Sequence, residues 1–260
     1  MSLPMVGAGP SAVSSGEFSP DDLAGLLLWV KSDTGTYQDD AMTTPATGDG
    51  DAVGGWEDQS GNGNHLTQSG ANKPELDLNQ INSLPAVYLA NEGEYLGRAD
   101  ALGFTGNPAI SVFIVAKDAE TGSASGRFFQ LGANDGAAGE VVGLSPEGGA
   151  SYRYNNGNQA FSGADWASWS YSAWIRAAGA DYGSGEYWHN GISMAETGTG
   201  SPTNTPSLAN EECITAGRSN AGAAILGLEG WIAEIIVYNS ALSAANRQSV
   251  EAYLAARYGI

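Results

Sequence analysis

The chain has 260 residues, of which 29 are acidic and 10 are basic, so its formal net charge at pH 7 is −19. Such a charge repels phosphate backbones and anionic membranes, which argues against nucleic acid and lipid surfaces as partners. Cys213 is the single cysteine, which excludes an intramolecular disulfide framework and a cysteine-rich zinc site. No apolar run approaches the roughly 18 residues that a membrane span needs.

The N-terminal stretch, residues 1–16, consists of small and apolar residues interrupted by prolines and glycines. This composition predicts an extended arm rather than a folded unit. We therefore divide the chain into an arm, residues 1–17, and one domain, residues 18–260. The stretch also lacks the charged and continuous apolar regions of a signal peptide, so no ordinary export signal is expected.

A short helical turn is predicted directly after the arm. Ser19 can cap its N-terminus, Pro20 suits the first helical position, and Asp21 and Asp22 lie at the positive end of the helix dipole. An apolar strand, residues 26–30, follows the turn.

Short apolar and β-branched segments recur along the rest of the chain, separated by many of its 37 glycines. The strongest are residues 110–116 and 231–238, and Asn190-Gly191 marks a hairpin between two further strands. Many short strands at even spacing predict an all-β sandwich or jelly roll. Only the C-terminus is helical in pattern, from a Ser243 cap to a stop at Gly259.

The stretch Trp56–Gln68 combines a large aromatic residue, an acidic residue and a tight polar turn. Side-chain oxygens alternate along it, which is typical of a calcium site with Asp58 and Asn62 as ligands. In the alternative, Asp58 and Asn62 hydrogen-bond the backbone of their own turn, and Trp56 anchors a strand end in the core.

Seven aromatic residues fall within the 23 positions from 166 to 188. Their faces would suit a sugar or a protein partner, although large aromatic residues also fill sandwich cores. Because side chains alternate along a strand, one set is expected to point inward. The candidates for a glycan or protein interface are Trp166, Trp169, Trp174, Tyr187 and Trp188.

Three stretches together resemble a known family: residues 19–30, Trp56–Gln68, and residues 230–259. They are similar to the concanavalin A-like, laminin G-like jelly-roll domains of bacterial surface proteins and of structural proteins of tailed bacteriophages. The resemblance covers about residues 18–260 and is loose in the middle. It implies two antiparallel sheets stacked face to face, with a short N-terminal helical turn and one C-terminal helix. Glycan or protein contacts would then be made by the concave sheet and the rim loops.

Related jelly rolls include glycoside hydrolases, in which retaining hydrolysis needs two carboxylates about 5–5.5 Å apart. In hydrolases of this fold the carboxylates lie on one strand as Glu-x-Asp-x-x-Glu, and that motif does not occur in this chain. The two histidines, His65 and His189, lie in no recognisable serine or cysteine motif. We therefore expect a protein that is not an enzyme and requires no cofactor, with calcium as an optional ligand.

These observations predict a virion structural protein, a head decoration or a tail-associated subunit that displays a lectin-like domain on the virion surface. Its arm would dock on a capsid or tail protein of the same virion through Leu3, Pro4, Met5 and Val6. Cell-surface glycans are a further expected partner. The alternatives are a glycan-binding adhesion module of a bacterial surface protein and a glycan-degrading enzyme.

Overall fold

The computed structural model describes residues 17–90, 93–119, 127–132, 142–145, 151–154, 157–160, 165–181, 184–195, 207–209, 213–215 and 229–260. The proposed docking residues of the arm, Leu3, Pro4, Met5 and Val6, lie outside these described residues.

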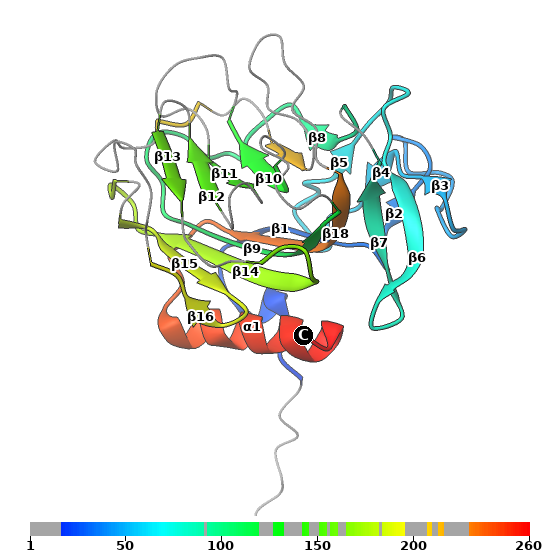
Figure 1. The fold of residues 1–260 in the computed structure, drawn as a ribbon. Helices are drawn as coiled ribbons and strands as arrows, with labels where there is room; N and C mark the ends of the chain where they lie inside the picture. The colour runs from blue at the N-terminus through cyan, green and yellow to red at the C-terminus, as the bar shows by residue number, and fades with distance from the viewer. Residues whose placement is uncertain are drawn as a thin grey trace, which may run out of the picture.

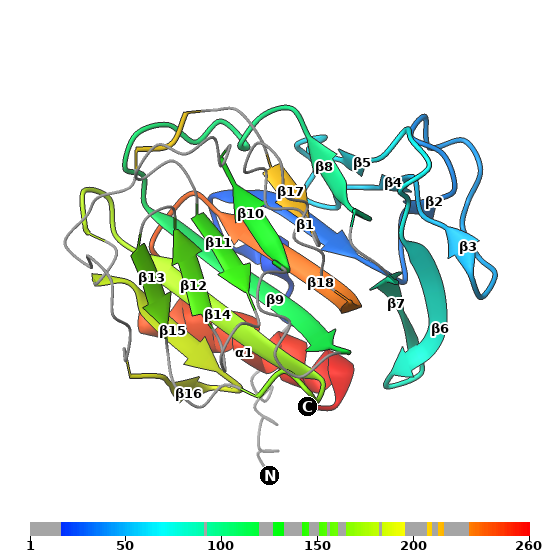
Figure 2. The same ribbon diagram turned by 45° about the horizontal axis from the view of Figure 1, so that its top comes forward.

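The described strands form two antiparallel sheets stacked on each other (Figures 1 and 2). Sheet A has the order β16-β15-β14-β9-β18-β7-β6-β3, and β1 also pairs with β18. Its strands are β1 (Leu26–Lys31), β3 (Asp51–Ala52), β6 (Glu75–Ile81), β7 (Leu84–Leu89), β9 (Ile110–Asp118), β14 (Ser170–Arg176), β15 (Glu186–His189), β16 (Ile192–Ser193) and β18 (Gly230–Tyr238).

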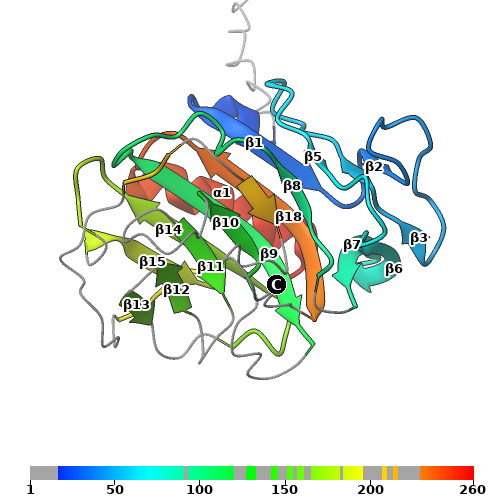
Figure 3. The same ribbon diagram turned by 90° about the horizontal axis from the view of Figure 1, so that it is seen from above.

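Sheet B has the order β13-β12-β11-β10-β17-β8-β5-β4-β2. Seen from above, β10 and β17 of sheet B lie over β9 and β18 of sheet A (Figure 3). The strands of sheet B are β2 (Thr36–Tyr37), β4 (Gly55–Trp56), β5 (Leu66–Thr67), β8 (Leu96–Arg98), β10 (Phe129–Leu131), β11 (Val142–Ser145), β12 (Ser151–Tyr154), β13 (Gly157–Ala160) and β17 (Cys213–Thr215).

Two helical elements accompany the sheets: the turn η1 (Pro20–Asp22) and the helix α1 (Ala244–Tyr258), which lies against the outer face of sheet A (Figure 1). The predicted fold class is confirmed: an all-β sandwich of two antiparallel sheets, with a short N-terminal turn and one C-terminal helix. In the part of the chain that the structure describes, no helix is long and apolar enough to cross a membrane.

The central strands of sheet A, β9, β14 and β18, are buried on both faces, which explains their long apolar runs. The inner core lies between the sheets, and the outer core lies between sheet A and α1. On β9, Val112 and Ile114 join the inner core, whereas Phe113 and Val115 join the outer core. A strand covered on both sides reads as an uninterrupted apolar run, as residues 110–116 do.

The helix α1 begins and ends where the sequence predicts. The Ser243 hydroxyl accepts a hydrogen bond from the Asn246 backbone N–H at 3.3 Å, and Gly259 adopts a left-handed conformation with φ of 70°. The buried side chains of Val250, Leu254 and Tyr258 pack onto sheet A and complete the outer core.

Candidate functional site

The loop of residues 56–68, called the edge loop from here on, covers the edge of β1 that does not pair with β18. The Ser60 hydroxyl donates to the Leu27 carbonyl at 3.0 Å, and the Asn62 side-chain amide donates to the Leu26 carbonyl at 2.8 Å. An exposed strand edge is a template for unwanted pairing, and side chains that occupy its carbonyls remove that risk.

Asp58 organises the edge loop. Its Oδ1 accepts from the backbone N–H groups of Trp29 and Ser60, both at 2.9 Å. Its Oδ2 accepts from the Ser60 hydroxyl at 2.7 Å and from the Asn64 backbone N–H at 2.9 Å. Asp58 is only 6% exposed, and these four donors occupy the acceptor sites of its carboxylate.

This geometry bears on the expected calcium site. An ion bound by Asp58 would have to displace hydrogen bonds that its carboxylate already accepts. Among the described residues, no group of three or more histidine, cysteine, aspartate or glutamate side chains is placed to hold a metal. Calcium at Asp58 and Asn62 stays a prediction, whereas the hydrogen bonds match the turn-organising alternative.

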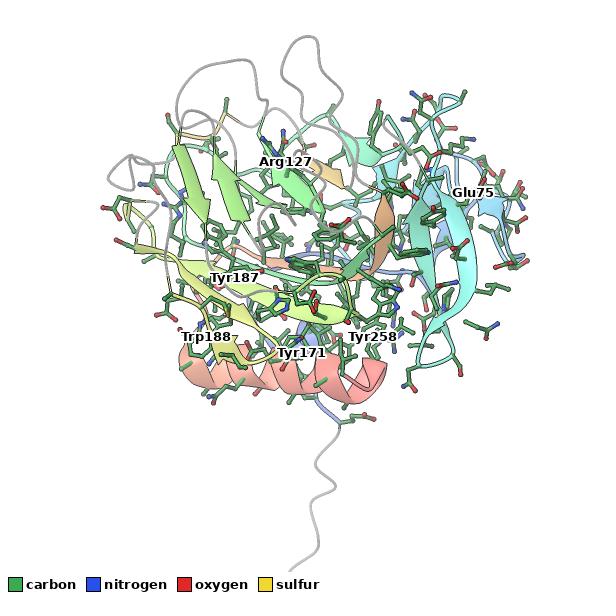
Figure 4. All side chains as sticks on the ribbon, viewed as in Figure 1. Glu75, Arg127, Tyr171, Tyr187, Trp188 and Tyr258 are labelled. Carbon is green, nitrogen blue, oxygen red and sulfur yellow. The ribbon has the colours of Figure 1, made fainter. Side chains whose placement is uncertain are left out.

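The aromatic candidates of residues 166–188 divide between the two cores. Trp166, Trp174 and Tyr187 are buried in the inner core, so they offer no free ring face to a ligand. Trp169 and Trp188 are partly buried and pack against the outer core instead. Figure 4 shows Tyr187 and Trp188 on opposite sides of sheet A, as alternation along β15 requires. A glycan or interface role for Trp169 and Trp188 stays a prediction.

A buried serine–histidine pair lies beside this group. The Tyr187 hydroxyl donates to the Ser172 Oγ at 2.9 Å, and the Ser172 Oγ lies within hydrogen-bond distance of the His189 Nδ1, 2.8 Å away. Burial lowers the pKa of His189. Because all three side chains are enclosed in the sandwich, the pair acts as an internal hydrogen-bond chain rather than as an exposed nucleophile.

A bulge in β18 turns Glu234 toward the helix. The register of β18 against β9 shifts between Ile232 and Glu234. Ile232 and Ile235 belong to the inner core and Ala233 to the outer core, so strict alternation would point Glu234 inward. The extra residue places Glu234 on the same side as Ala233.

Glu234 is fully buried and joins β1 to the last turns of α1. Its Oε1 accepts from the Trp29 indole N–H at 2.6 Å and from the Tyr253 hydroxyl at 3.0 Å. Its Oε2 accepts from the Tyr258 hydroxyl at 2.7 Å and lies 3.4 Å from Arg257 Nε. Figure 4 places Tyr258 between α1 and sheet A.

Burial dominates the protonation of Glu234. It raises the pKa of the carboxyl above its usual range, and the surrounding donors and the Arg257 charge only partly oppose it. The same burial, together with the nearby Glu234, raises the pKa values of Tyr253 and Tyr258, so both hydroxyls remain protonated donors.

A cavity of about 480 Å³ lies next to this network. Its walls come from the residues before η1, from β1, from the turn between β6 and β7, and from α1. The lining residues are Glu17, Phe18, Ser19, Trp29, Lys31, Asn82, Leu84, Tyr253, Ala256 and Arg257.

Three aromatic rings form one corner of the cavity. Tyr253 meets Phe18 edge to face with ring centroids 6.5 Å apart, and it meets Trp29 in the same way at 6.3 Å. The Lys31 ammonium lies 4.6 Å from the centroid of the Trp29 ring. An ion pair lies beside the rings: Arg257 Nη2 is 2.6 Å from an Asp33 carboxylate oxygen.

The sequence patterns missed this site. Trp29 and Glu234 are separated by 205 positions, and no motif joins them. One signal was present, because Glu234 is the single charged residue inside the apolar strand of residues 231–238. A charge in a strand of that kind needs partners, but the sequence does not name them.

The sequence matches no protein-family model and no curated protein sequence. Its fold, however, is similar to solved structures. One is domain 4 of AbnA, a GH43 extracellular arabinanase from Geobacillus stearothermophilus, in complex with arabinotriose. That match has a TM-score of 0.58 and 16% identity, and it covers 87% of this chain and 97% of the domain.

Two further neighbours are larger chains. A GH54 α-L-arabinofuranosidase soaked with a cyclic sulfate inhibitor matches with a TM-score of 0.58 and 19% identity, over 80% of this chain and 51% of the other. Trypanosoma rangeli sialidase in complex with 2,3-difluorosialic acid matches with a TM-score of 0.59 and 13% identity, over 94% of this chain and 35% of the other. The chain thus spans about half of the arabinofuranosidase and a third of the sialidase. At these low identities, the TM-scores show a shared β-sandwich fold.

The comparisons correct the predicted function. These neighbours are glycoside hydrolases or a domain of one, which contradicts the expected virion structural protein with a head or tail location. The expectation that the chain is not an enzyme is contradicted for the same reason. It rested on the missing Glu-x-Asp-x-x-Glu motif and on the absence of a serine or cysteine motif around His65 and His189. The missing motif excludes only one arrangement of catalytic carboxylates, and one fold supports many functions. The resemblance holds as far as a β-sandwich fold, and the comparisons do not support its extension to phage proteins.

Proposed function

We propose that the chain is a glycan-binding β-sandwich module of a carbohydrate-active protein. The observation that carries the proposal is the similarity to domain 4 of the AbnA arabinanase, in which the two chains correspond over 87% and 97% of their lengths. That domain is a separate unit of a larger enzyme and is in complex with arabinotriose. The match to the sialidase covers only 35% of that chain, so it corresponds to one part of a larger protein rather than to a whole domain structure.

The described surface offers two places for a glycan. The first is the cavity with its half-buried rings of Phe18 and Tyr253. The second is the pair Trp169 and Trp188 beside α1. In both places a flat apolar ring lies next to hydrogen-bonding groups, the combination that suits the apolar faces and the hydroxyl groups of a sugar.

Glycan hydrolysis is the second candidate function. The similarity to the GH54 arabinofuranosidase over 80% of this chain favours it. A hydrolase would bind the same class of ligand, so the two candidates differ only in whether glycosidic bonds are broken.

The test combines binding with product release. Isothermal titration calorimetry with arabinotriose, xylotriose, cellotriose and trigalacturonic acid should show at least one ligand with a dissociation constant between about 1 μM and 1 mM, which corresponds to about −8.2 to −4.1 kcal/mol. A parallel assay measures reducing ends released from arabinan and xylan. Binding without release supports the binding module, and release supports the hydrolase. Absence of binding to every oligosaccharide and polysaccharide would refute the proposal.

A further inference from the structure

We infer that the cavity beside Phe18, Trp29 and Tyr253 is the glycan-binding site and that it takes a neutral oligosaccharide. The inference rests on the proposed glycan-binding function and adds a location and a ligand class. The location is unexpected, because the resemblance implied contacts at the concave sheet and rim loops, whereas this cavity lies on the helix side of sheet A.

The size and lining of the cavity suit a small polar ligand. Its volume of about 480 Å³ falls within the range of roughly 300–1,000 Å³ that is usual for small-molecule sites. Phe18 and Tyr253 are half-buried, so each keeps part of its ring available for the C–H face of a sugar. Leu84 and Ala256 extend the apolar part of the wall.

The walls are held in place before any ligand binds. The Trp29 backbone is fixed by the edge loop, since its N–H donates to Asp58 at 2.9 Å and its carbonyl accepts from the Gln59 N–H at 2.6 Å. Glu234 then holds the Trp29 indole and the Tyr253 hydroxyl. A site whose side chains are already fixed loses little conformational entropy on binding.

The charges of the lining nearly balance, which favours a neutral sugar. Arg257 is paired with Asp33, and the remaining charged groups of the lining, Lys31 and Glu17, have opposite signs. Hydroxyl groups both donate and accept, so they can use Lys31 and Asn82 as donors and Glu17 as an acceptor. An anionic glycan would also meet the repulsion of a chain with a net charge of −19.

In the other aromatic pair, Trp188 is less available. The Arg247 guanidinium lies 3.5 Å from the centroid of the Trp188 ring, so it covers one ring face. The Trp188 indole N–H donates to Glu186 at 3.3 Å. These contacts occupy one face and the indole N–H of Trp188, so we favour the cavity.

Calorimetry on the full chain with arabinotriose and trigalacturonic acid tests the inference. Phe18→Ala removes a ring from the wall, and Lys31→Met removes the ammonium while keeping an apolar side chain over Trp29. Both should weaken arabinotriose binding at least about tenfold. Trp188→Ala tests the competing site, and Ile192→Ala, at a position that is 67% exposed, is the surface control. Both should stay within about twofold of the wild type. Thermal unfolding of each variant shows that it is folded.

Each outcome has a distinct meaning. Loss of affinity in Phe18→Ala and Lys31→Met, with Trp188→Ala unchanged, supports the cavity. Loss in Trp188→Ala, with both cavity variants unchanged, refutes the location but keeps the proposed function. Tighter binding of trigalacturonic acid than of arabinotriose refutes the neutral class. If Phe18→Ala unfolds, Lys31→Met decides alone. A wild-type chain that binds no glycan refutes the proposed function itself.

Discussion

Two buried carboxylates hold Trp29 from opposite ends, and they differ in how far away their partners lie. Asp58 accepts the backbone N–H of Trp29, and Glu234 accepts its indole N–H. The other donors to Asp58 are Ser60 and Asn64, two and six positions away. The other donors to Glu234 come from α1, and Trp29 itself is 205 positions away. Asp58 shapes a loop, whereas Glu234 fastens separate elements together.

The largest effect is expected from removing Glu234. Glu234→Ala leaves the Trp29 indole N–H and two tyrosine hydroxyls without their buried acceptor and opens a void between α1 and sheet A. We expect the free energy of unfolding to fall by about 3–5 kcal/mol in urea denaturation.

The matched control for this variant is Glu75→Ala, because Glu75 is an exposed glutamate on β6 of the same sheet (Figure 4). That substitution should change stability by about 0.5 kcal/mol or less. Equal losses in the two variants would show that Glu234 does not fasten α1 to the sheet.

Asp58→Ala should have the next largest effect, a loss of about 2–3 kcal/mol. The variant removes an acceptor of four hydrogen bonds, but the edge loop is close to solvent, where water can replace some of them. Asp58→Asn keeps one acceptor oxygen and should lose about half as much. Urea denaturation gives both values. A loss larger than that of Glu234→Ala would reverse the comparison between the two carboxylates.

This difference in range explains what the sequence could predict. The hydrogen bonds that Asp58 makes to Ser60 and Asn64 follow from the spacing of one short motif, and the Ser243 cap of α1 follows from local rules in the same way. The position of Glu234 depends on a bulge and on a partner in β1 that lies 205 positions away in the chain, and no local pattern encodes either. The cavity was missed for this reason.

The aromatic stretch shows an intermediate case. Alternation predicted that one set of side chains points inward, but the sequence did not say which set. The structure assigns Trp174 and Tyr187 to the inner core and Trp188 to the helix side, because pairing of β14 with β9 fixes which face of the strand meets sheet B.

The pH dependence of stability should separate the two carboxylates further. Burial raises the pKa of Glu234 above the value of about 4.3 for glutamate in an unfolded chain. Between these two pKa values the folded protein keeps a proton that the unfolded chain has released, so the contribution of Glu234 to stability falls as the pH rises. Glu234→Gln cannot titrate at this position.

Urea denaturation at several pH values from about 4 to 8 compares the wild type with Glu234→Gln. As the pH rises, the unfolding free energy of the wild type should fall relative to that of the glutamine variant. A difference that moves in favour of the wild type would show that the hydrogen bonds and Arg257 outweigh burial and lower the pKa instead.

A smaller effect should appear as coupling between the two carboxylates. Asp58→Asn and Glu234→Gln each weaken a hydrogen bond to Trp29. Their losses of unfolding free energy should therefore not be additive. We expect the double variant to lose about 0.5–1 kcal/mol less than the sum of the single variants. Additive losses would mean that Trp29 does not transmit strain between the edge loop and α1, and that the two carboxylates act on separate parts of the fold.

The smallest effect is expected from calcium. Each carboxylate oxygen of Asp58 already accepts two hydrogen bonds. Calcium prefers six to eight oxygen ligands, so it would compete with these hydrogen bonds for the oxygens of Asp58. Differential scanning calorimetry with an excess of calcium, compared with magnesium and with a chelator, should show a change in melting temperature of about 1 °C or less. A rise of several degrees that disappears in Asp58→Asn would establish the predicted site at Asp58 and Asn62, since only ligands that prefer the folded state stabilise it. Asp58 would then be a metal ligand, and the hydrogen bonds of the edge loop would describe its metal-free form.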